Sequence, residues 1–397
     1  MVNAFFGVQI YTFSLSSKKK TTFFYHFFLF LGDYGLFLPP IKAQKAFLCV
    51  KMDAIAEILI DWYDTHHREL PWRETRDPYA VWISEIILQQ TRVAQGYDYY
   101  VRFLRTFPTV EALAAADEDR VLRLWQGLGY YSRARNLHAA ARQIVAQGGF
   151  PTTYEGLLRL RGVGEYTAAA IGSFAYGIPL AVVDGNVYRV LSRLFAATEP
   201  IDTTSGKKLF AQMATQLLPG EASAHYNQAI MEFGALQCVP HSPRCDVCPL
   251  VGKCLALARG MVDELPVKSH RTKVTERWFH YFYVHNATHM YLHHRTANDI
   301  WRGLYELPLL ETPGNLNDFK VPKDLNNLKD INSLTPAFRF CATRRHVLSH
   351  QVIHATLYEA EVQGELPPSP LYNTIRIDDL DDYALPRLVT LLLGDRE

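Results

Sequence analysis

Two carboxylates, Glu85 and Asp184, lie in sequence environments that favour different protonation states. Three of the four nearest helical neighbours of Glu85 are apolar: Val81, Trp82 and Leu88. If that helix face is buried, desolvation should raise the pKa of Glu85. Asp184 follows an apolar run and precedes a helical pattern, so the helix dipole should favour its ionised form. A neutral acid beside a carboxylate anion suits acid-assisted cleavage of a glycosidic bond.

Both carboxylates also have purely structural interpretations. Glu85 could lie on an exposed face of the helix that starts at Asp77-Pro78, a typical N-cap followed by a first-turn proline. Asp184 could serve only as the N-cap of the next helix. The surrounding motifs must therefore decide between chemistry and structure.

Four of the six cysteines fall in one short stretch with the spacing C-x6-C-x2-C-x5-C. Prolines interrupt any helix there, so the thiolates can converge from a loop. Four thiolates suit either a [4Fe–4S] cluster or a structural zinc ion. Zinc sites usually pair two C-x2-C units and only one occurs here, which favours iron–sulfur. Such clustering indicates a metal site in a reducing compartment rather than a disulfide framework. The four residues are Cys238, Cys245, Cys248 and Cys254.

A glycine-containing turn, L-R-G-V-G-E-Y at residues 160–166, separates two helical patterns. Gly162 and Gly164 allow a tight turn that exposes successive backbone N–H groups at the start of a helix. Such a turn can bind a DNA phosphate without reading sequence. Alone it is a weak signal, because most turns of this kind only connect two helices.

The hydrophobic period changes once along the chain. Residues 52–260 have helical periodicity almost throughout, with short breaks at proline and glycine. From about residue 275 the pattern alternates as in strands, and residues 386–393 suggest a closing helix. We expect an all-α domain over 52–260, a linker over 261–274, and a smaller α+β domain over 275–397.

The composition is that of a globular protein of 397 residues, with 48% hydrophobic and 20% charged residues. The formal net charge is only +1, so any nucleic-acid-binding charge must be concentrated on one face. No stretch reaches the roughly 20 uninterrupted apolar residues of a membrane helix.

Residues 1–51 differ from the rest of the chain. They contain Lys18 to Lys20, many Phe and Leu residues, a single acid at Asp33 and no arginine. They lack a signal-peptide cleavage pattern and the arginines of a mitochondrial presequence. We expect a disordered, dispensable extension or a misassigned start, with Met52 as the natural first residue; a targeting segment is the alternative.

In this order, the hairpin, the V-D-G-N-V strip at 183–187 and the cysteine loop resemble the helix-hairpin-helix glycosylases of the endonuclease III superfamily. Four further motifs resemble the MutY-type adenine glycosylases within it: L-P-W-R, W-I-S-E-I-I-L-Q-Q-T, G-L-G-Y-Y-S-R-A-R-N-L and M-E-F-G-A. The match runs from about Met52 to Cys254. It implies a helix-hairpin-helix glycosylase domain with a [4Fe–4S] loop.

The resemblance implies a role for each matching residue. Glu85 would be the general acid at adenine N7, and Asp184 would stabilise the oxocarbenium ion, with a transient covalent adduct as one form of that stabilisation. Gln90 and Tyr130 would enter the DNA helix beside the flipped base. The four cysteines would hold the cluster. The residues lining the adenine pocket would be Trp72, Arg73 and Glu232.

Tyr166 stands where strand-cleaving relatives carry a lysine. A lysine amine can form a Schiff base with the sugar and a tyrosine cannot, so we expect base removal alone. An endonuclease III-like enzyme acting on oxidised pyrimidines is the first alternative. A non-catalytic DNA-binding module with a cluster is the second, and the intact pair Glu85 and Asp184 opposes it.

The second domain resembles the Nudix-like domain of these glycosylases through W-R-G-L-Y-E-L-P (301–308) and R-R-H-V-L-S-H-Q (344–351). The resemblance implies that it senses 8-oxoguanine opposite the adenine, through Ser349 and His350. The family has an aromatic residue where this chain has Leu348, which can supply only apolar contact where an aromatic ring would stack, while the polar part of the recognition is kept. An ordinary turn at a strand end is the structural alternative.

The resulting expectation is a base-excision-repair enzyme that removes adenine mispaired with 8-oxoguanine or guanine by base flipping and hydrolysis. Its partner is double-stranded DNA containing these mispairs, and its cofactor is one [4Fe–4S] cluster. We expect a cytoplasmic, nucleoid-associated monomer without a membrane partner.

Overall fold

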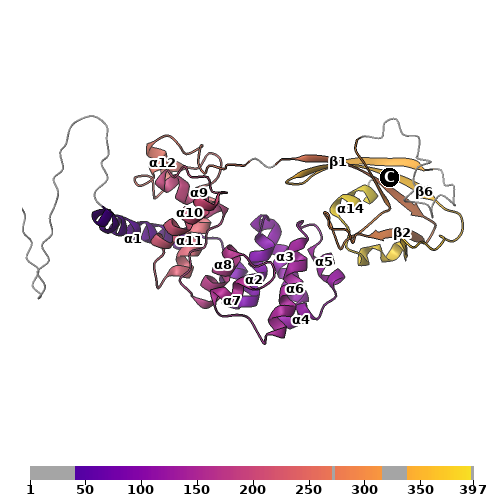
Figure 1. Ribbon diagram of the computed structural model, residues 1–397, viewed down its shortest axis with the longest axis horizontal. Helices are drawn as coiled ribbons and strands as arrows, with labels where there is room; N and C mark the ends of the chain where they lie inside the picture. Colours follow the sequence, from indigo (N-terminus) through magenta and orange to yellow (C-terminus); the bar gives the residue numbers. More distant parts are fainter. Residues whose placement is uncertain (1–40, 271–272, 315–337, 395–397) are drawn as a thin grey trace, which may run out of the picture. The chain divides into compact units, whose positions relative to one another are not determined.

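The computed structural model describes residues 41–270, 273–314 and 338–394, with side chains from residue 54 onward. Its first part is helical (Figure 1). The helices are α1 (Ile41–His66), α2 (Pro78–Leu88), α3 (Val93–Thr106), α4 (Val110–Ala114), α5 (Glu118–Trp125), α6 (Ser132–Ala146), α7 (Tyr154–Leu158), α8 (Glu165–Tyr176), α9 (Gly185–Phe195), α10 (Thr204–Leu217), α11 (Ser223–Leu236) and α12 (Leu255–Ala258). Two 3-10 turns accompany them, η1 (Pro71–Arg73) and η2 (Cys245–Val247).

Helix α2 starts where the sequence predicts. The side chain of Asp77 accepts hydrogen bonds from the backbone N–H groups of Tyr79 and Ala80, and Pro78 occupies the first turn. The cap satisfies donors that have no partner inside the helix, and proline loses nothing at that position. This local signal fixes where Glu85 falls along the helix.

The helical domain has two hydrophobic cores. The first gathers buried residues of helices α2 to α8, including Trp82, Phe103 and Trp125. The second joins α1 to α9, α10 and α11, around residues such as Leu59 and Phe210. Glu85 belongs to a helix of the first core, whereas Asp184 begins a helix of the second. The two carboxylates are therefore supplied by different halves of the domain.

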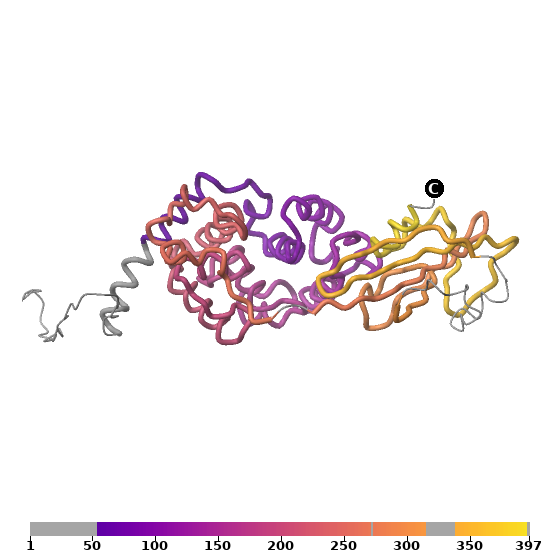
Figure 2. Tube along the Cα trace, turned by 90° about the horizontal axis from the view of Figure 1, so that it is seen from above, coloured from indigo at the N-terminus to yellow at the C-terminus, as the bar shows by residue number. Residues whose placement is uncertain are grey.

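The second domain is built on a seven-stranded mixed sheet. Strand order is β3-β2-β1-β6-β5, with β4 paired to β1 and β7 paired to β2. Strands β1 and β6 run parallel side by side (Figure 2), and β5 is antiparallel to β6. The strands are β1 (Thr275–His285), β2 (His289–His294), β3 (Tyr305–Glu306), β4 (Leu309–Thr312), β5 (Arg339–Val347), β6 (Gln351–Glu361) and β7 (Asn373–Arg376).

Alternation along β1 gives the sheet two apolar faces. Phe279, Tyr281 and Tyr283 belong to one core, together with residues of helix α14 (Arg387–Gly394). Phe282 and Val284 point to a second core on the opposite face. Side chains of a strand alternate between faces, so a strand that is apolar on both sides is covered on both.

Most predicted boundaries agree with the structure. Strand β1 begins at Thr275, and the closing helix α14 lies where residues 386–393 predict it. No helix among the described residues is long and apolar enough to cross a membrane.

The start of α1 differs from the expectation. This helix begins at Ile41, eleven residues before Met52, so the backbone of residues 41–51 is helical. A physical reason is that extending a nucleated helix costs far less than starting one, and the packed segment from Ile55 onward supplies the nucleus. The predicted extension over residues 1–40 lies outside the described residues.

Candidate active site

Glu85 is buried, with 7% of its surface exposed, on the inner side of α2. The hydroxyl of Tyr166, in the first turn of α8, donates a hydrogen bond of 2.6 Å to its Oε2. Burial raises the pKa of Glu85 to about 7, and the bond from Tyr166 opposes that rise. The expectation of a desolvated carboxyl is confirmed, and at neutral pH a substantial fraction carries a proton.

Asp184 is the N-cap of α9, as the sequence predicts. Its Oδ1 accepts from the backbone N–H of Val187 at 2.7 Å, and its Oδ2 accepts from Asn186 Nδ2 at 2.8 Å. Burial nevertheless raises the pKa of Asp184 above its ordinary value, while these hydrogen bonds and Arg189 act in the lowering direction. Desolvation therefore sets the direction of the pKa shift of Asp184, which is opposite to the direction expected from the helix dipole.

The two carboxylates belong to one electrostatic site. The charge of Asp184 contributes to the raised pKa of Glu85. The pKa of Tyr166 is raised far above its ordinary value, mainly by burial and in addition by the charges of both carboxylates. Such interactions require proximity inside the protein. The tertiary fold thus brings together residues that are 99 positions apart in sequence.

Arg73 and Glu232 meet in a buried ion network beside the carboxylate pair. Both oxygens of Glu232, which is 1% exposed, accept from Arg73 and Arg68, with shortest distances of 2.6 Å. Burial alone would raise the pKa of Glu232, but the bonds from Arg68 and Arg73 lower it to about 2. The positive charge of Arg73 also reaches Glu85, whose pKa it lowers. Arg68 was not predicted from the sequence.

Trp72 is held rigidly inside the helical domain. It is buried in the first core and packs edge-on against Tyr100, with ring centroids 5.1 Å apart. In this arrangement its ring supports η1, the turn that carries Arg73.

Gln90 and Tyr130 share an unusual backbone conformation. Their φ angles are +57° and +47°, in the left-handed region that non-glycine residues seldom adopt. Both side chains are exposed, Tyr130 by 46%. Strained, exposed residues of this kind concentrate at functional sites, where surrounding structure holds them. The structure therefore presents both predicted wedge residues on tight loops at the surface.

Arg133 holds these two loops together, a role that was not predicted from the sequence. Its buried guanidinium donates to the carbonyls of Ile86, Ile87 and Gln89 at the end of α2, and to those of Leu128 and Gly129. Burial lowers the pKa of Arg133 to about 10, still well above neutrality. One cation thus satisfies carbonyls from both loops and fixes their separation. The polar sequence context R-A-R-N predicts an exposed side chain at this position, whereas the fold buries it.

The hairpin has the tight turn that its glycines predict. Gly162 has a φ of +75°, and a Cβ there would lie 2.6 Å from Cβ of Asn136, so only glycine fits. Gly164 is the N-cap of α8, with open space around its Cα. A ligand can therefore approach the first N–H groups of α8 closely, as a phosphate at a helix N-terminus does.

The four cysteines of the loop converge. They line one small cavity of about 30 Å³ together with apolar side chains such as Leu194, Phe233 and Leu250. Burial raises the pKa of the Cys248 thiol to about 11, and neighbouring cysteines add to this. Within the described residues, no group of three or more His, Cys, Asp and Glu side chains is placed to hold a single metal ion.

Two arginines of α9 connect the cysteine loop to α9 and to its N-cap. Arg189 donates to the Cys238 carbonyl and to Asn186 Oδ1, and Asn186 in turn donates to Asp184. Arg193 donates to the carbonyls of residues 239 and 240 and lies 3.5 Å from the Cys238 sulfur. The loop and the N-cap of α9 are thus parts of one hydrogen-bond network.

Ser349 and His350 form the exposed turn between β5 and β6. The Tyr130 hydroxyl donates a 2.9 Å hydrogen bond to Ser349 Oγ, which lies 3.1 Å from His350 Nδ1. Leu348 packs against the sheet core. The turn is therefore in direct contact with one of the two wedge residues, a link that the sequence could not reveal.

Both domains match families of known proteins. Residues 83–214 match the HhH-GPD superfamily of base excision DNA repair proteins, and residues 280–394 match the NUDIX domain family. A solved thermostable thymine-DNA glycosylase superposes with a TM-score of 0.50 and 29% identity, covering 53% of this chain and 98% of that protein.

Curated relatives carry the name adenine DNA glycosylase. One from Buchnera aphidicola subsp. Baizongia pistaciae is 31% identical over 310 residues, which cover 76% of this chain and 83% of the relative. The mouse relative is 44% identical over 223 residues, covering 52% of this chain and 43% of its own length. The alignment thus spans most of the bacterial relative but less than half of the mouse protein.

Proposed function

Because the chain belongs to the adenine DNA glycosylase family, we propose that it excises adenine from mispaired DNA in base excision repair. The observation that carries this proposal is the buried carboxyl of Glu85, with a pKa near 7, facing the charge of Asp184. A carboxyl that is partly neutral at physiological pH can donate a proton, and one nearby anion can stabilise a cation.

In the proposed reaction, Glu85 protonates N7 of a flipped adenine. The bond between sugar C1′ and base N9 then breaks, and its electron pair leaves with the protonated base. Asp184 stabilises the resulting oxocarbenium ion, and water adds to C1′ with loss of a proton. Tyr166 holds Oε2 of Glu85, which leaves Oε1 to carry the transferred proton.

We propose base removal without strand cleavage. The residue beside Glu85 is Tyr166, whose phenol cannot form a Schiff base with the sugar. Treatment with borohydride during turnover should therefore trap no protein–DNA adduct, while alkali should cleave the product at the abasic site. A trapped adduct would instead support the endonuclease III-like alternative.

The surface loops supply the proposed flipping machinery. Gln90 and Tyr130, held by the cation of Arg133, would enter the duplex, and the turn at Gly162 and Gly164 would bind a phosphate. Arg73, fixed by Glu232, would contact the extruded base.

We also propose one [4Fe–4S] cluster at the cysteine loop. The four cysteines line one cavity, and they include one C-x2-C pair, whereas structural zinc sites usually combine two. Four cysteine thiolates are the usual ligands of a [4Fe–4S] cluster, so this set of residues fits it. When bound, it would tie α9, α12 and the loop together.

Purified protein is therefore expected to be brown, with about four irons per chain. Replacement of one ligand, Cys248→Ala, should lower the iron content and the melting temperature. Cys341→Ala, in the sheet, is the matched control and should leave iron unchanged. Colourless protein with one zinc per chain would contradict the cluster.

The turn between β5 and β6 is proposed to read the base opposite adenine. Adenine opposite thymine is normal, so specificity must come from that opposite base. 8-Oxoguanine differs from guanine by a C8 carbonyl and an N7 proton, groups that a hydroxyl and an imidazole can contact. The hydrogen bond from Tyr130 to Ser349 supports this assignment, because it places the turn beside a wedge residue.

The variant Ser349→Ala/His350→Ala should reduce the preference for A:8-oxoguanine over A:G duplexes by roughly 5- to 150-fold, equivalent to about 1–3 kcal/mol. The ratio of single-turnover adenine-release rates on the two duplexes measures it. Thr343→Ala, exposed on the same hairpin, is the control. An unchanged ratio would assign lesion sensing to other residues.

A further inference from the structure

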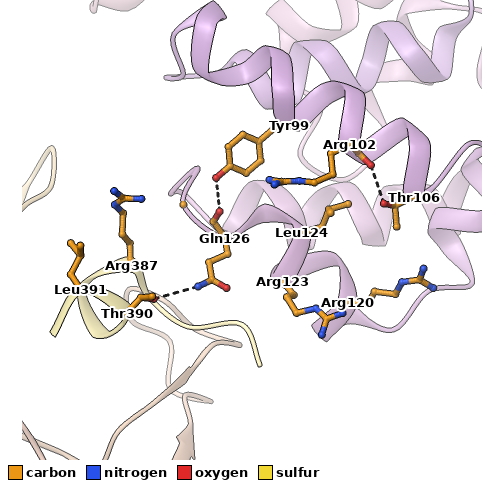
Figure 3. Close-up of a pocket in the computed structure, with 11 residues that line it drawn as sticks. Tyr99, Arg102, Thr106, Arg120, Arg123, Leu124, Gln126, Arg387, Thr390 and Leu391 are labelled. Carbon is orange, nitrogen blue, oxygen red and sulfur yellow. Dashed lines mark hydrogen bonds between the residues drawn. The ribbon is translucent and has the colours of Figure 1, made fainter. Parts of the chain in front are cut away.

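A cavity of about 550 Å³ is lined by residues of α3, α5 and α14 and contains neither Glu85 nor Asp184 in its lining (Figure 3). Hydrogen bonds across it join the two domains: Arg123 donates to Asp382, and Gln126 Nε2 donates to Thr390 Oγ1. We call this cavity the arginine pocket, because its lining includes Arg102, Arg120, Arg123 and Arg387.

The charge of the arginine pocket has one sign. Four of its lining residues are arginines and none is acidic. Arg102 and Arg120 lie over the rings of Tyr99 and Phe107, at 4.5 and 5.5 Å, instead of pairing with carboxylates. Among the described ion pairs, Arg123 alone of the four has a carboxylate partner. Like charges gathered at a cavity attract a compensating anion.

Guanidinium groups favour phosphate among anions. Their planar fork can form two parallel hydrogen bonds to phosphate oxygens, and their charge is not lost at any physiological pH. With a volume of about 550 Å³ the cavity has room for more than one phosphate group, and its arginines come from three separate helices. The ligand chemistry is therefore that of a phosphodiester or pyrophosphate.

The neighbourhood of the pocket points to DNA as the source of the phosphate. Gly127 lines it, and Tyr130 follows three residues later, within about 11 Å of chain. Helix α3, which supplies Tyr99 and Arg102, begins three residues after Gln90. Successive phosphates of a strand rise by about 3.4 Å along the duplex axis. A strand at Tyr130 thus reaches the pocket within a few nucleotides.

We propose that the arginine pocket binds backbone phosphates of the DNA strand beside the mispair, with Arg102 and Arg387 as principal contacts. This inference rests on the proposed function and extends it. Because the lining comes from both domains, the contact couples their engagement of one duplex. It is independent of base identity, since phosphates carry no sequence information.

The test uses Arg102→Gln and Arg387→Gln in the full chain. Arg105→Gln is the control, because Arg105 is exposed on the same helix and does not line the pocket. Affinity for duplexes with A:8-oxoguanine, A:G and A:T is measured against salt concentration. Each pocket substitution should weaken binding equally on all three and lower the salt slope by about 1, more than the control does.

A salt slope unchanged from wild type in both pocket variants would overturn the proposal. A second arm titrates pyrophosphate and follows the melting temperature. A rise that Arg102→Gln removes, with DNA affinity unaffected, would assign the pocket to a free phosphate ligand and also overturn it. Adenine release is measured in a separate assay. If the wild-type protein released no adenine, the proposed function would fail, whereas the DNA-binding result would still test the arginine pocket.

Discussion

Glu85→Gln should lower the single-turnover rate of adenine release by roughly 10²–10⁴-fold, the usual contribution of a positioned general acid. The amide matches the carboxyl in size and can still accept the hydrogen bond from Tyr166, so folding should be preserved. It has no proton to give to a leaving base. Affinity for a mispaired duplex should change little.

The pH dependence of the adenine-release rate tests the role of Glu85 independently. Burial raises the pKa of Glu85 to about 7, so its acid form is lost as pH rises through neutrality. The wild-type rate should therefore fall above about pH 7, and this limb should disappear in Glu85→Gln. Glu57→Gln, exposed on α1, is the control. A pH-independent wild-type rate would contradict general-acid catalysis by this carboxyl.

Asp184→Asn should reduce the rate by about 10²–10³-fold, in the range seen when one electrostatic stabiliser of a transition state is removed. A neutral amide cannot stabilise the cationic sugar. Asparagine is as good an N-cap as aspartate, so α9 should keep its start and the protein its melting temperature. Loss of rate without loss of stability would separate the chemical role from the capping role.

The cap interpretation makes the opposite prediction for Asp184. If its only task is to accept the N–H of Val187, Asp184→Asn should retain most of the activity. Asp184→Ala, which removes both the charge and the cap, should then lower the melting temperature and the rate together. Retained activity in the asparagine variant would overturn the assigned role.

Local signals predicted local structure well. Asp77 caps α2 and strand β1 starts at Thr275, because capping and alternation depend only on neighbouring residues. Desolvation of Glu85 could also be predicted from the sequence, since its nearest helical neighbours are mostly apolar. Its partner Tyr166 was identified through a motif, but the contact between them depends on the packing of α8 against α2.

Effects that arise from burial in the tertiary structure could not be predicted from the sequence. The pKa of Asp184 is raised, although its position at a helix N-terminus predicts the reverse, because α9 carries it into the interior. Arg133 and Arg68 are charged residues in polar sequence contexts, yet each has its guanidinium bound by groups distant in sequence. Nothing in a one-dimensional pattern identifies such partners. The left-handed backbone conformations of Gln90 and Tyr130 could not be predicted from the sequence either.

The most direct test of the central claim is the release of free adenine from a duplex containing one A:8-oxoguanine pair under single-turnover conditions. A duplex containing thymine glycol and a fully paired A:T duplex are run in parallel. Wild-type protein should release adenine from the first, leave an abasic strand that breaks only on alkaline treatment, and act on neither of the others. Absence of adenine release, or strand cleavage at thymine glycol, would contradict the account.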